Sequence, residues 1–325
     1  MLFKRRYDQD LQLIQTPQAW VAFGLLAAAL IALPFLVRGY IVYNVSLFLI
    51  YALVAVSLAI LVGFTGQVSL GHAGFLAAGA YVTAYLSSSD WPFLLALVAA
   101  MIVTGLLGLI IGVPALRLEG PYLAIATLGF GLGIQQILNN WSLVGASTGM
   151  LVNRPEILGI AFFRDTPYYY LVLGIAGLSI WGCFNLSRSH IGRAFRAVRD
   201  ADLAAQMSGI NLAYYKSLAF VLSAMLAGLA GGLFGPLVGY ITPESFNLLL
   251  SIKFLLMTIV GGLGFLPGAI IGAAFVTGIE VWLSSFRNWS QLVFGAVVVA
   301  LMMLEPFGLY GRWLKVRQFW KTWPF

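Results

Sequence analysis

The sequence IVYNVSLFLIYALVAVSLAILV, residues 41–62, decides the fold. It contains no aspartate, glutamate, lysine or arginine, and it is as long as the ~20 residues that a helix needs to cross the hydrocarbon core of a bilayer. Because a helix that is apolar on every side needs an apolar environment on every side, we interpret this stretch as a transmembrane helix.

Further apolar stretches repeat this pattern along the rest of the chain. We place them at about 19–37, 67–87, 92–113, 121–139, 168–186, 217–238, 248–264, 268–284 and 290–305. The last three are short enough to be tilted or re-entrant. The sequence therefore predicts an all-α polytopic membrane protein with about ten transmembrane helices, some of them broken or re-entrant.

The composition excludes a soluble core. Hydrophobic residues make up 61% of the 325 residues and charged residues only 9%, whereas a soluble domain carries about 25% charged residues. The single cysteine excludes a disulfide framework and a cysteine-ligated metal cluster. The two histidines, His72 and His190, lie far apart in the sequence, and we expect no metal site.

The positions of lysine and arginine predict the orientation of the chain, because cytoplasmic segments carry an excess of both. With the N-terminus inside, thirteen of the 18 basic residues lie inside, namely Lys4, Arg5, Arg6, Arg117, Arg188, Arg193, Arg196, Arg199, Lys216, Arg312, Lys315, Arg317 and Lys321. Four lie outside. Both termini are therefore expected in the cytoplasm, and the net charge of +7 needs no nucleic acid to explain it.

This orientation divides the chain into one transmembrane domain, residues 1–325, with four parts outside the membrane. They are a cytoplasmic tail at 1–18, an external loop at 140–167, a cytoplasmic loop at 187–216 and a cytoplasmic tail at 306–325. No stretch of low complexity suggests a linker to a separate soluble domain.

Motifs for nucleotide binding or catalysis are missing from the sequence. The stretch Gly145–Gly149 lacks the lysine with which a phosphate loop contacts nucleotide phosphates, and no His-Glu-x-x-His pair occurs. We therefore expect no catalytic residue, no bound cofactor and no ATP hydrolysis by this chain alone. An intramembrane enzyme is the alternative, and it would need a catalytic pair that the sequence does not offer.

A cluster of glycine and polar residues, GFTGQVSLGHAG at 63–74, interrupts the apolar pattern. Irregular backbone at membrane depth is tolerated only where protein or a water-filled cavity satisfies its polar groups, so such a segment is a candidate for lining a pathway. His72 has two main interpretations: it lines or gates the pathway, or it bonds to a carbonyl group of a neighbouring helix. Metal binding is a third, for which the sequence shows no second ligand.

Two charged residues, Lys253 and Glu280, lie within apolar stretches. In the proposed topology both lie roughly 6–8 Å below the outer surface, at ~1.5 Å of helix rise per residue. Charges inside a membrane are costly and are usually paired or in contact with water. The sequence therefore indicates a salt bridge, with separate extension of each side chain to the outer interface as the alternative.

The loop 187–216 contains an amphipathic, helix-compatible run. One side of this run is apolar, with Phe195, Val198 and Leu203 beside Ala194, Ala201 and Ala205, and the other is charged, with Arg193, Arg196, Arg199 and Asp200. Basic amphipathic helices lie on membrane surfaces. A docking helix for a cytoplasmic protein is the equally favoured alternative.

Three motifs resemble the permeases of branched-chain amino acid ABC importers, and in particular the LivM-like subunit. The first is GFTGQVSLGHAGFLAAGAY at 63–81 together with YLAIATLGF at 122–130. The second is GRAFRAVRD at 192–200, continued to Gly209-Ile-Asn211, and the third is GGLG at 261–264 with Pro267-Gly268 and Gly272-Ala273. The resemblance extends from about residue 40 to 305.

The resemblance implies a role in an importer of the bacterial inner membrane. It implies a second, LivH-like permease, two cytoplasmic ATPase subunits that bind ATP and magnesium, and an external substrate-binding protein. The translocation path would be lined or shaped by Gln67, Ser69, His72 and Thr127. ATPase coupling would involve Gly192, Arg193, Arg196, Arg199, Asp200, Ala204, Met207 and Gly209.

The implied substrate is a branched-chain or similar hydrophobic amino acid. Related permeases of the same superfamily carry urea, short-chain amides or sugars, and these are alternatives. A stand-alone channel or an ion-coupled carrier is a further alternative, for which the cytoplasmic loop at 187–216 would have no obvious use.

Overall fold

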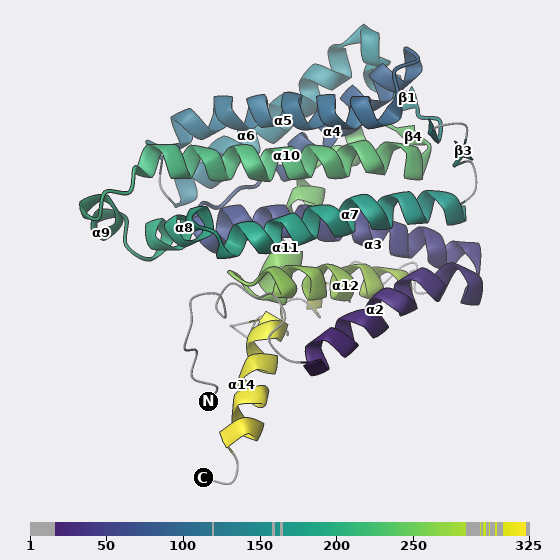
Figure 1. The fold of residues 1–325 in the computed structure, drawn as a ribbon. Helices are drawn as coiled ribbons and strands as arrows, with labels where there is room; N and C mark the ends of the chain where they lie inside the picture. Colours follow the sequence, from purple (N-terminus) through teal and green to yellow (C-terminus); the bar gives the residue numbers. More distant parts are fainter. Residues whose placement is uncertain are drawn as a thin grey trace.

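A computed structural model describes residues 17–118, 120–157, 160–162, 165–283 and 308–322, with the isolated residues 293, 295, 296, 299 and 303. The long helices are α2 (Pro17–Leu36), α3 (Gly39–Leu58), α4 (His72–Ser88), α5 (Phe93–Ala115), α6 (Pro121–Asn140), α7 (Asp165–Arg188), α10 (Leu212–Val238), α11 (Leu248–Gly261) and α12 (Leu266–Leu283). Most of them lie side by side (Figure 1).

Shorter elements join the long helices. They are the π-helix η1 (Ala59–Phe64), α8 (His190–Asp200), α9 (Asp202–Met207), α14 (Gly308–Thr322), the 3-10 helices η2 (Ser142–Val144), η3 (Ala146–Thr148) and η4 (Pro243–Phe246), and the strands β1 (Met150–Leu151), β2 (Glu156–Ile157), β3 (Ile160–Ala161) and β4 (Tyr240–Ile241). The strands form two antiparallel pairs, β1 with β4 and β2 with β3.

Six described helices are long and apolar enough to cross a membrane: α3 with η1, α5, α6, α7, α10 and α12. Residues 24–36 and α11 form shorter apolar helices. The all-α, multi-pass architecture thus agrees with the prediction, but six spans of full length are fewer than the ten expected. The expected span at 67–87 is shorter because its helix begins only at His72, and most of 290–305 lies outside the described residues.

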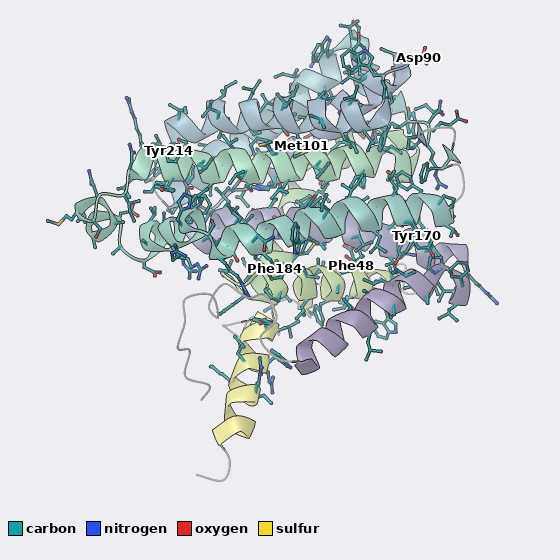
Figure 2. All side chains as sticks on the ribbon, viewed as in Figure 1. Phe48, Asp90, Met101, Tyr170, Phe184 and Tyr214 are labelled. Carbon is teal, nitrogen blue, oxygen red and sulfur yellow. The ribbon has the colours of Figure 1, made fainter. Side chains whose placement is uncertain are left out.

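The connecting segments gather at two opposite ends of the helices (Figure 1). Residues 141–157 and 239–247 form what we name the strand end, where Met150 pairs with Ile241. Residues 189–211 form what we name the α8 end. In Figure 2, the labelled residue Asp90 lies at the strand end and Tyr214 at the α8 end. The helices α3, α5, α6, α7 and α10 therefore run between these two ends.

Helices α3 and α10 form the centre of the bundle. In their most apolar windows, 83% and 72% of the residues are buried, against 22% in α6 and α7, which therefore lie at the outside. Tyr168 of α7 is fully buried and donates a hydrogen bond of 2.6 Å to the carbonyl oxygen of Leu233 in α10. Side chains such as that of Met101 on α5 pack against this core (Figure 2).

Glycine permits close packing between α4 and α10. A β-carbon at Gly79 would overlap the carbonyl oxygen of Gly228, and a β-carbon at Gly231 would overlap that of Leu76. The two backbones therefore touch directly, as small residues allow in membrane helices. By contrast, Gly129 and Gly133 on α6 have no other group within 4 Å of such a β-carbon.

Candidate translocation and coupling sites

The helical structure of the chain is interrupted between α3 and α4, and we name this interruption, residues 66–71, the break. Helix α3 widens into η1, and residues 66–71 have no regular helical structure before α4 begins. Several of their backbone N–H groups are nevertheless bonded: Gly66 N and Gln67 N donate to carbonyl groups of η1, and Leu70 N donates to Thr127 Oγ1 over 3.0 Å. Protein rather than lipid thus satisfies the irregular backbone, as the apolar surroundings require.

His72 occupies the start of α4 and joins three parts of the bundle. Its Nδ1 lies 3.0 Å from Ser69 Oγ, and its Nε2 lies 2.8 Å from Ser223 Oγ in α10. Ser223 in turn donates to the carbonyl oxygen of Ser57 in α3, so it accepts from Nε2–H. Nδ1 then carries no proton and accepts from Ser69, which gives a neutral imidazole with both nitrogens bonded.

The contacts of His72 are made with two hydroxyl groups, and a role in lining or gating the pathway stays a prediction. The side chain is fully buried, and its partners are hydroxyl groups rather than a carbonyl group or an open cavity. Since both ring nitrogens are used, neither is free to bind a metal. Among the described residues, no three His, Cys, Asp or Glu side chains come together as metal ligands.

The other predicted path residues are buried as well. Thr127 accepts from Leu70 N and donates to the carbonyl oxygen of Ala124. Gln67 accepts from Thr65 Oγ1 over 2.9 Å, while its Nε2 has no hydrogen-bond partner among the residues that the structure describes. Ser69, His72 and Thr127 thus surround the break, and their hydrogen bonds hold it in shape.

Sequence reasoning missed three serines of this site. Ser57, Ser223 and Ser251 are buried, and Ser251 Oγ accepts from Ala73 N over 3.0 Å. Ser223 lies 151 residues from His72 in the sequence, and each of the three serines has an apolar residue on either side in the sequence. The only signal that could have indicated them is a hydroxyl group on an otherwise apolar helix face.

Lys253 of α11 and Glu280 of α12 form an ion pair. Lys253 Nζ lies 2.5 Å from Glu280 Oε2, and 4.7 Å from the centre of the Tyr51 ring in α3. A cation over an aromatic face is favoured electrostatically. The lysine side chain is 17% exposed, so its charge is held between a carboxylate and a ring rather than extended separately to the interface.

The loop 187–216 forms two helices instead of one continuous amphipathic run. Helix α8 starts at the cap Ser189, whose side chain accepts from Gly192 N, and it ends where Ala201 adopts an extended conformation. A β-carbon at Gly192 would overlap the carbonyl oxygens of Leu186 and Ser187, which explains the need for glycine there. Helix α9 follows directly, and the extended residue Ala201 gives it a different direction from that of α8.

The predicted single apolar stripe is therefore wrong. Phe195 and Val198 of α8 are fully buried against the bundle, where Phe195 contacts the ring of Tyr215. Leu203 and Met207 of α9 point away and are 78% and 91% exposed. The bend at Ala201 therefore separates Leu203 and Met207 from Phe195 and Val198, while Ala205 of α9 is buried. Asp200, Ala204 and Gly209 are also exposed at the α8 end.

The three arginines of α8 make different contacts. Arg193 Nη1 donates to the carbonyl oxygen of Arg188 over 3.0 Å, within the same loop. The Arg196 guanidinium lies 5.4 Å from the centre of the Phe64 ring and also bonds the carbonyl oxygens of Ser187 and Gly192. Arg199 Nη1 donates to the carbonyl oxygen of Gly63 over 2.5 Å. Two of the three therefore contact η1.

Comparison with known proteins identifies the family. The family described as "Branched-chain amino acid transport system / permease component" matches residues 40–304. The permease proteins LivM of Salmonella typhimurium and of Escherichia coli K12 are each 32% identical to the chain over 305 residues, which cover 86% of this chain and 72% of the relative. LivH of Salmonella typhimurium is 25% identical over 81% of this chain and 91% of its own length.

No solved structure matches the chain. The family match nevertheless covers most of the sequence, including the break after η1, the α8–α9 loop and the glycine-rich turn before α12. The chain is a multi-pass membrane protein with helices apolar enough to span a bilayer. It belongs to the family of permease components of branched-chain amino acid transport systems.

Proposed function

We propose that this permease imports branched-chain or similar hydrophobic amino acids across a bacterial cytoplasmic membrane, driven by ATP. The observation that carries the proposal is the 32% identity to two LivM proteins over 86% of the chain.

In this proposal the α8 end faces the cytoplasm and the strand end faces outward, with both termini inside and about ten spans. Support comes from Arg188, Arg193, Arg196, Arg199 and Lys216, which lie on or beside the α8 end. Basic residues concentrate on the cytoplasmic side of membrane proteins. Residues 1–325 would act as one transmembrane domain.

A second, LivH-like permease would cover the outer face of α6. Gly129, Gly133, Gln136 and Asn140 are exposed and share one face of this helix. Amide side chains facing lipid would be costly, whereas small and polar residues favour contact with another membrane helix. The substrate path would run beside the break, whose shape Gln67, Ser69, His72 and Thr127 maintain.

Two ATPase subunits would bind ATP and magnesium and would dock at the α8 end. Leu203 and Met207 lie one turn apart on α9, and both are largely exposed although apolar. Beside them, an open groove is lined by Leu116, Gln206, Ile210 and Lys216. Apolar anchors next to a groove suit a protein partner. An external binding protein would deliver substrate at the strand end.

The test is uptake by the reconstituted complex of this chain with its LivH-like permease, ATPases and binding protein. We expect ATP-dependent accumulation of labelled leucine, isoleucine or valine, and none with an ATPase variant that binds but does not hydrolyse ATP. Uptake of urea, short-chain amides or sugars instead would contradict the proposed substrate class. Uptake without ATP hydrolysis would favour a channel or carrier.

A further inference from the structure

Two arginines of α8 hold the end of η1. Arg199 bonds the carbonyl oxygen of Gly63, and Arg196, one turn earlier, lies over the ring of Phe64. We name this pair of contacts the arginine clamp. It brings together two parts of the chain that are 136 residues apart in the sequence.

The clamp matches the electrostatics of a helix terminus. The last carbonyl groups of a helix lack partners within it and carry partial negative charge, which a cation stabilises. A guanidinium group meets this need well, because it is always charged and presents several N–H donors in one plane. Arg199 therefore has a specific partner in the membrane domain, although its charge also suits a cytoplasmic protein surface.

The end of η1 is tightly surrounded at this point. A β-carbon at Gly63 would lie 2.7 Å from Gly264 N, and one at Gly264 would lie 2.6 Å from Arg199 Nη1. Three segments thus meet without spare room: η1, the glycine turn at 262–265 and α8. Since close-packed groups transmit displacement and leave no gap to absorb it, η1 and the turn must follow α8.

The segment directly after the clamp is the least regular part of the crossing. Residues 66–71 have no repeating helical hydrogen bonds, and they are held by individual bonds, such as Leu70 N to Thr127 Oγ1, and by packing of Gly71 against Thr127. Irregular segments of this kind rearrange at lower free-energy cost than packed helices. A shift of η1 would therefore be absorbed here, next to His72 and Thr127.

Helix α8 is also connected, through α10, to α9, which carries the exposed residues Leu203 and Met207. Phe195 packs on Tyr215 of α10, and Asp202 of α9 forms an ion pair of 2.5 Å with Lys216 of α10. Force applied at Leu203 and Met207 would thus reach α8 through α9 and the start of α10. Within the part of the chain that the structure describes, α8 bonds the backbone of η1 through Arg199 of the clamp.

We propose that Arg199 is a positioning residue for transport, which couples movement of α8 to the break at 66–71 by holding the Gly63 carbonyl group. Arg196 supports the same contact through Phe64. This role rests on the proposed function, because the movement comes from ATPase subunits docked on α9. In this proposal α9 binds the ATPase, and Arg199 then transmits the movement of α8 to the break.

The experiment compares Arg199→Ala with Arg38→Ala in the reconstituted complex, measuring ATP hydrolysis and substrate uptake together. Arg38 is the control, since it is an exposed arginine directly before α3, at the opposite end of this helix from η1. For Arg199→Ala we expect normal assembly and hydrolysis, with uptake per ATP lowered about five- to tenfold. Arg199→Lys should restore part of the ratio because it keeps the charge, and Arg38→Ala should resemble the wild type.

A second measurement follows amide hydrogen exchange in residues 65–71 with and without ATP. We expect ATP to change exchange in the wild type and in Arg38→Ala, and to leave it unchanged in Arg199→Ala. This readout does not depend on the substrate. A wild-type complex that imports no amino acid would therefore contradict the proposed function, while the exchange comparison would still decide the clamp.

Two results would overturn the proposal. One is a wild-type ratio of uptake to hydrolysis in Arg199→Ala together with a normal exchange response. The other is a parallel fall of hydrolysis and uptake with loss of bound ATPase, which would show that Arg199 serves docking instead.

Discussion

His72 Nε2 lies 2.8 Å from Ser223 Oγ, and this contact ties the first residue of α4 to α10. Ser223 also contacts α3, because its hydroxyl group donates a hydrogen bond to the carbonyl oxygen of Ser57. A chain of hydrogen bonds therefore crosses the centre of the bundle beside the break. Each group in it has a partner, which is what an apolar environment demands of buried polar groups.

Ser223→Ala should destabilise the protein by about 1–3 kcal/mol, because it leaves His72 Nε2–H without a partner and removes the hydrogen bond that Ser223 donates to the Ser57 carbonyl group. The measurement is the midpoint of thermal unfolding of the purified protein in detergent. Ser88→Ala is the control, since Ser88 is exposed and bonds only the local carbonyl oxygen of Tyr85. Equal midpoints for the two variants would contradict the network.

Lys253→Met should cost more stability in the wild type than in a Glu280→Gln background. Removing one partner leaves the other charge uncompensated, so the two changes should not be additive. We expect an interaction free energy of roughly 0.5–3 kcal/mol in a double-mutant cycle of unfolding. Additive effects would show that the ion pair does not contribute to stability.

Gly79→Ala should prevent normal packing of α4 on α10, because its methyl group would overlap the Gly228 carbonyl oxygen. Overpacking of this kind costs typically 1–3 kcal/mol, and backbone that cannot move aside makes it worse. The amount of folded protein recovered from membranes measures the effect. Gly174→Ala is the matched control, since a β-carbon there meets no other group within 4 Å. Similar yields from both would contradict the close contact.

Single cysteines at positions 151 and 207 should report opposite sides of the membrane. Leu151 lies at the strand end and is 69% exposed, while Met207 lies at the α8 end and is 91% exposed. In intact cells, an impermeant thiol reagent should label Leu151→Cys and leave Met207→Cys unlabelled until the cells are opened. The native Cys183 is buried and should give little background. The reverse pattern would overturn the orientation.

The sequence predicted the apolar helices well, because a stretch as apolar as 41–62 can satisfy its backbone hydrogen bonds in a bilayer by forming a helix. It also indicated irregular backbone at 63–74, where four glycines and several polar residues interrupt the apolar pattern. The hydrogen-bond partners of His72 could not be predicted from the sequence, since a hydrogen bond between residues on distant helices produces no periodic pattern in the sequence. Helix α4 begins at His72 and not at residue 67, because Ser69 and Thr127 compete for the backbone donors of this segment.

The coupling loop shows a second limit. The pattern from Arg193 to Met207 fits one amphipathic helix, so the apolar residues were expected on one side. A single extended residue, Ala201, changes the direction of the chain and separates Phe195 from Leu203. An alanine carries no signal for such a bend. The basic residues were equally ambiguous, because Arg193 and Arg199 have the same charge but bond different parts of the protein.

The pairing of β1 with β4 gives the strand end a property that separate loops would lack. Met150 precedes α7, and Ile241 follows α10, yet the two strands share backbone hydrogen bonds, and Tyr240 also bonds the carbonyl oxygen of Thr148. The two strands therefore form one surface, to which the chain returns once after α6 and once after α10. In the proposed orientation, an external protein bound to this surface would contact both of these connections at the same time.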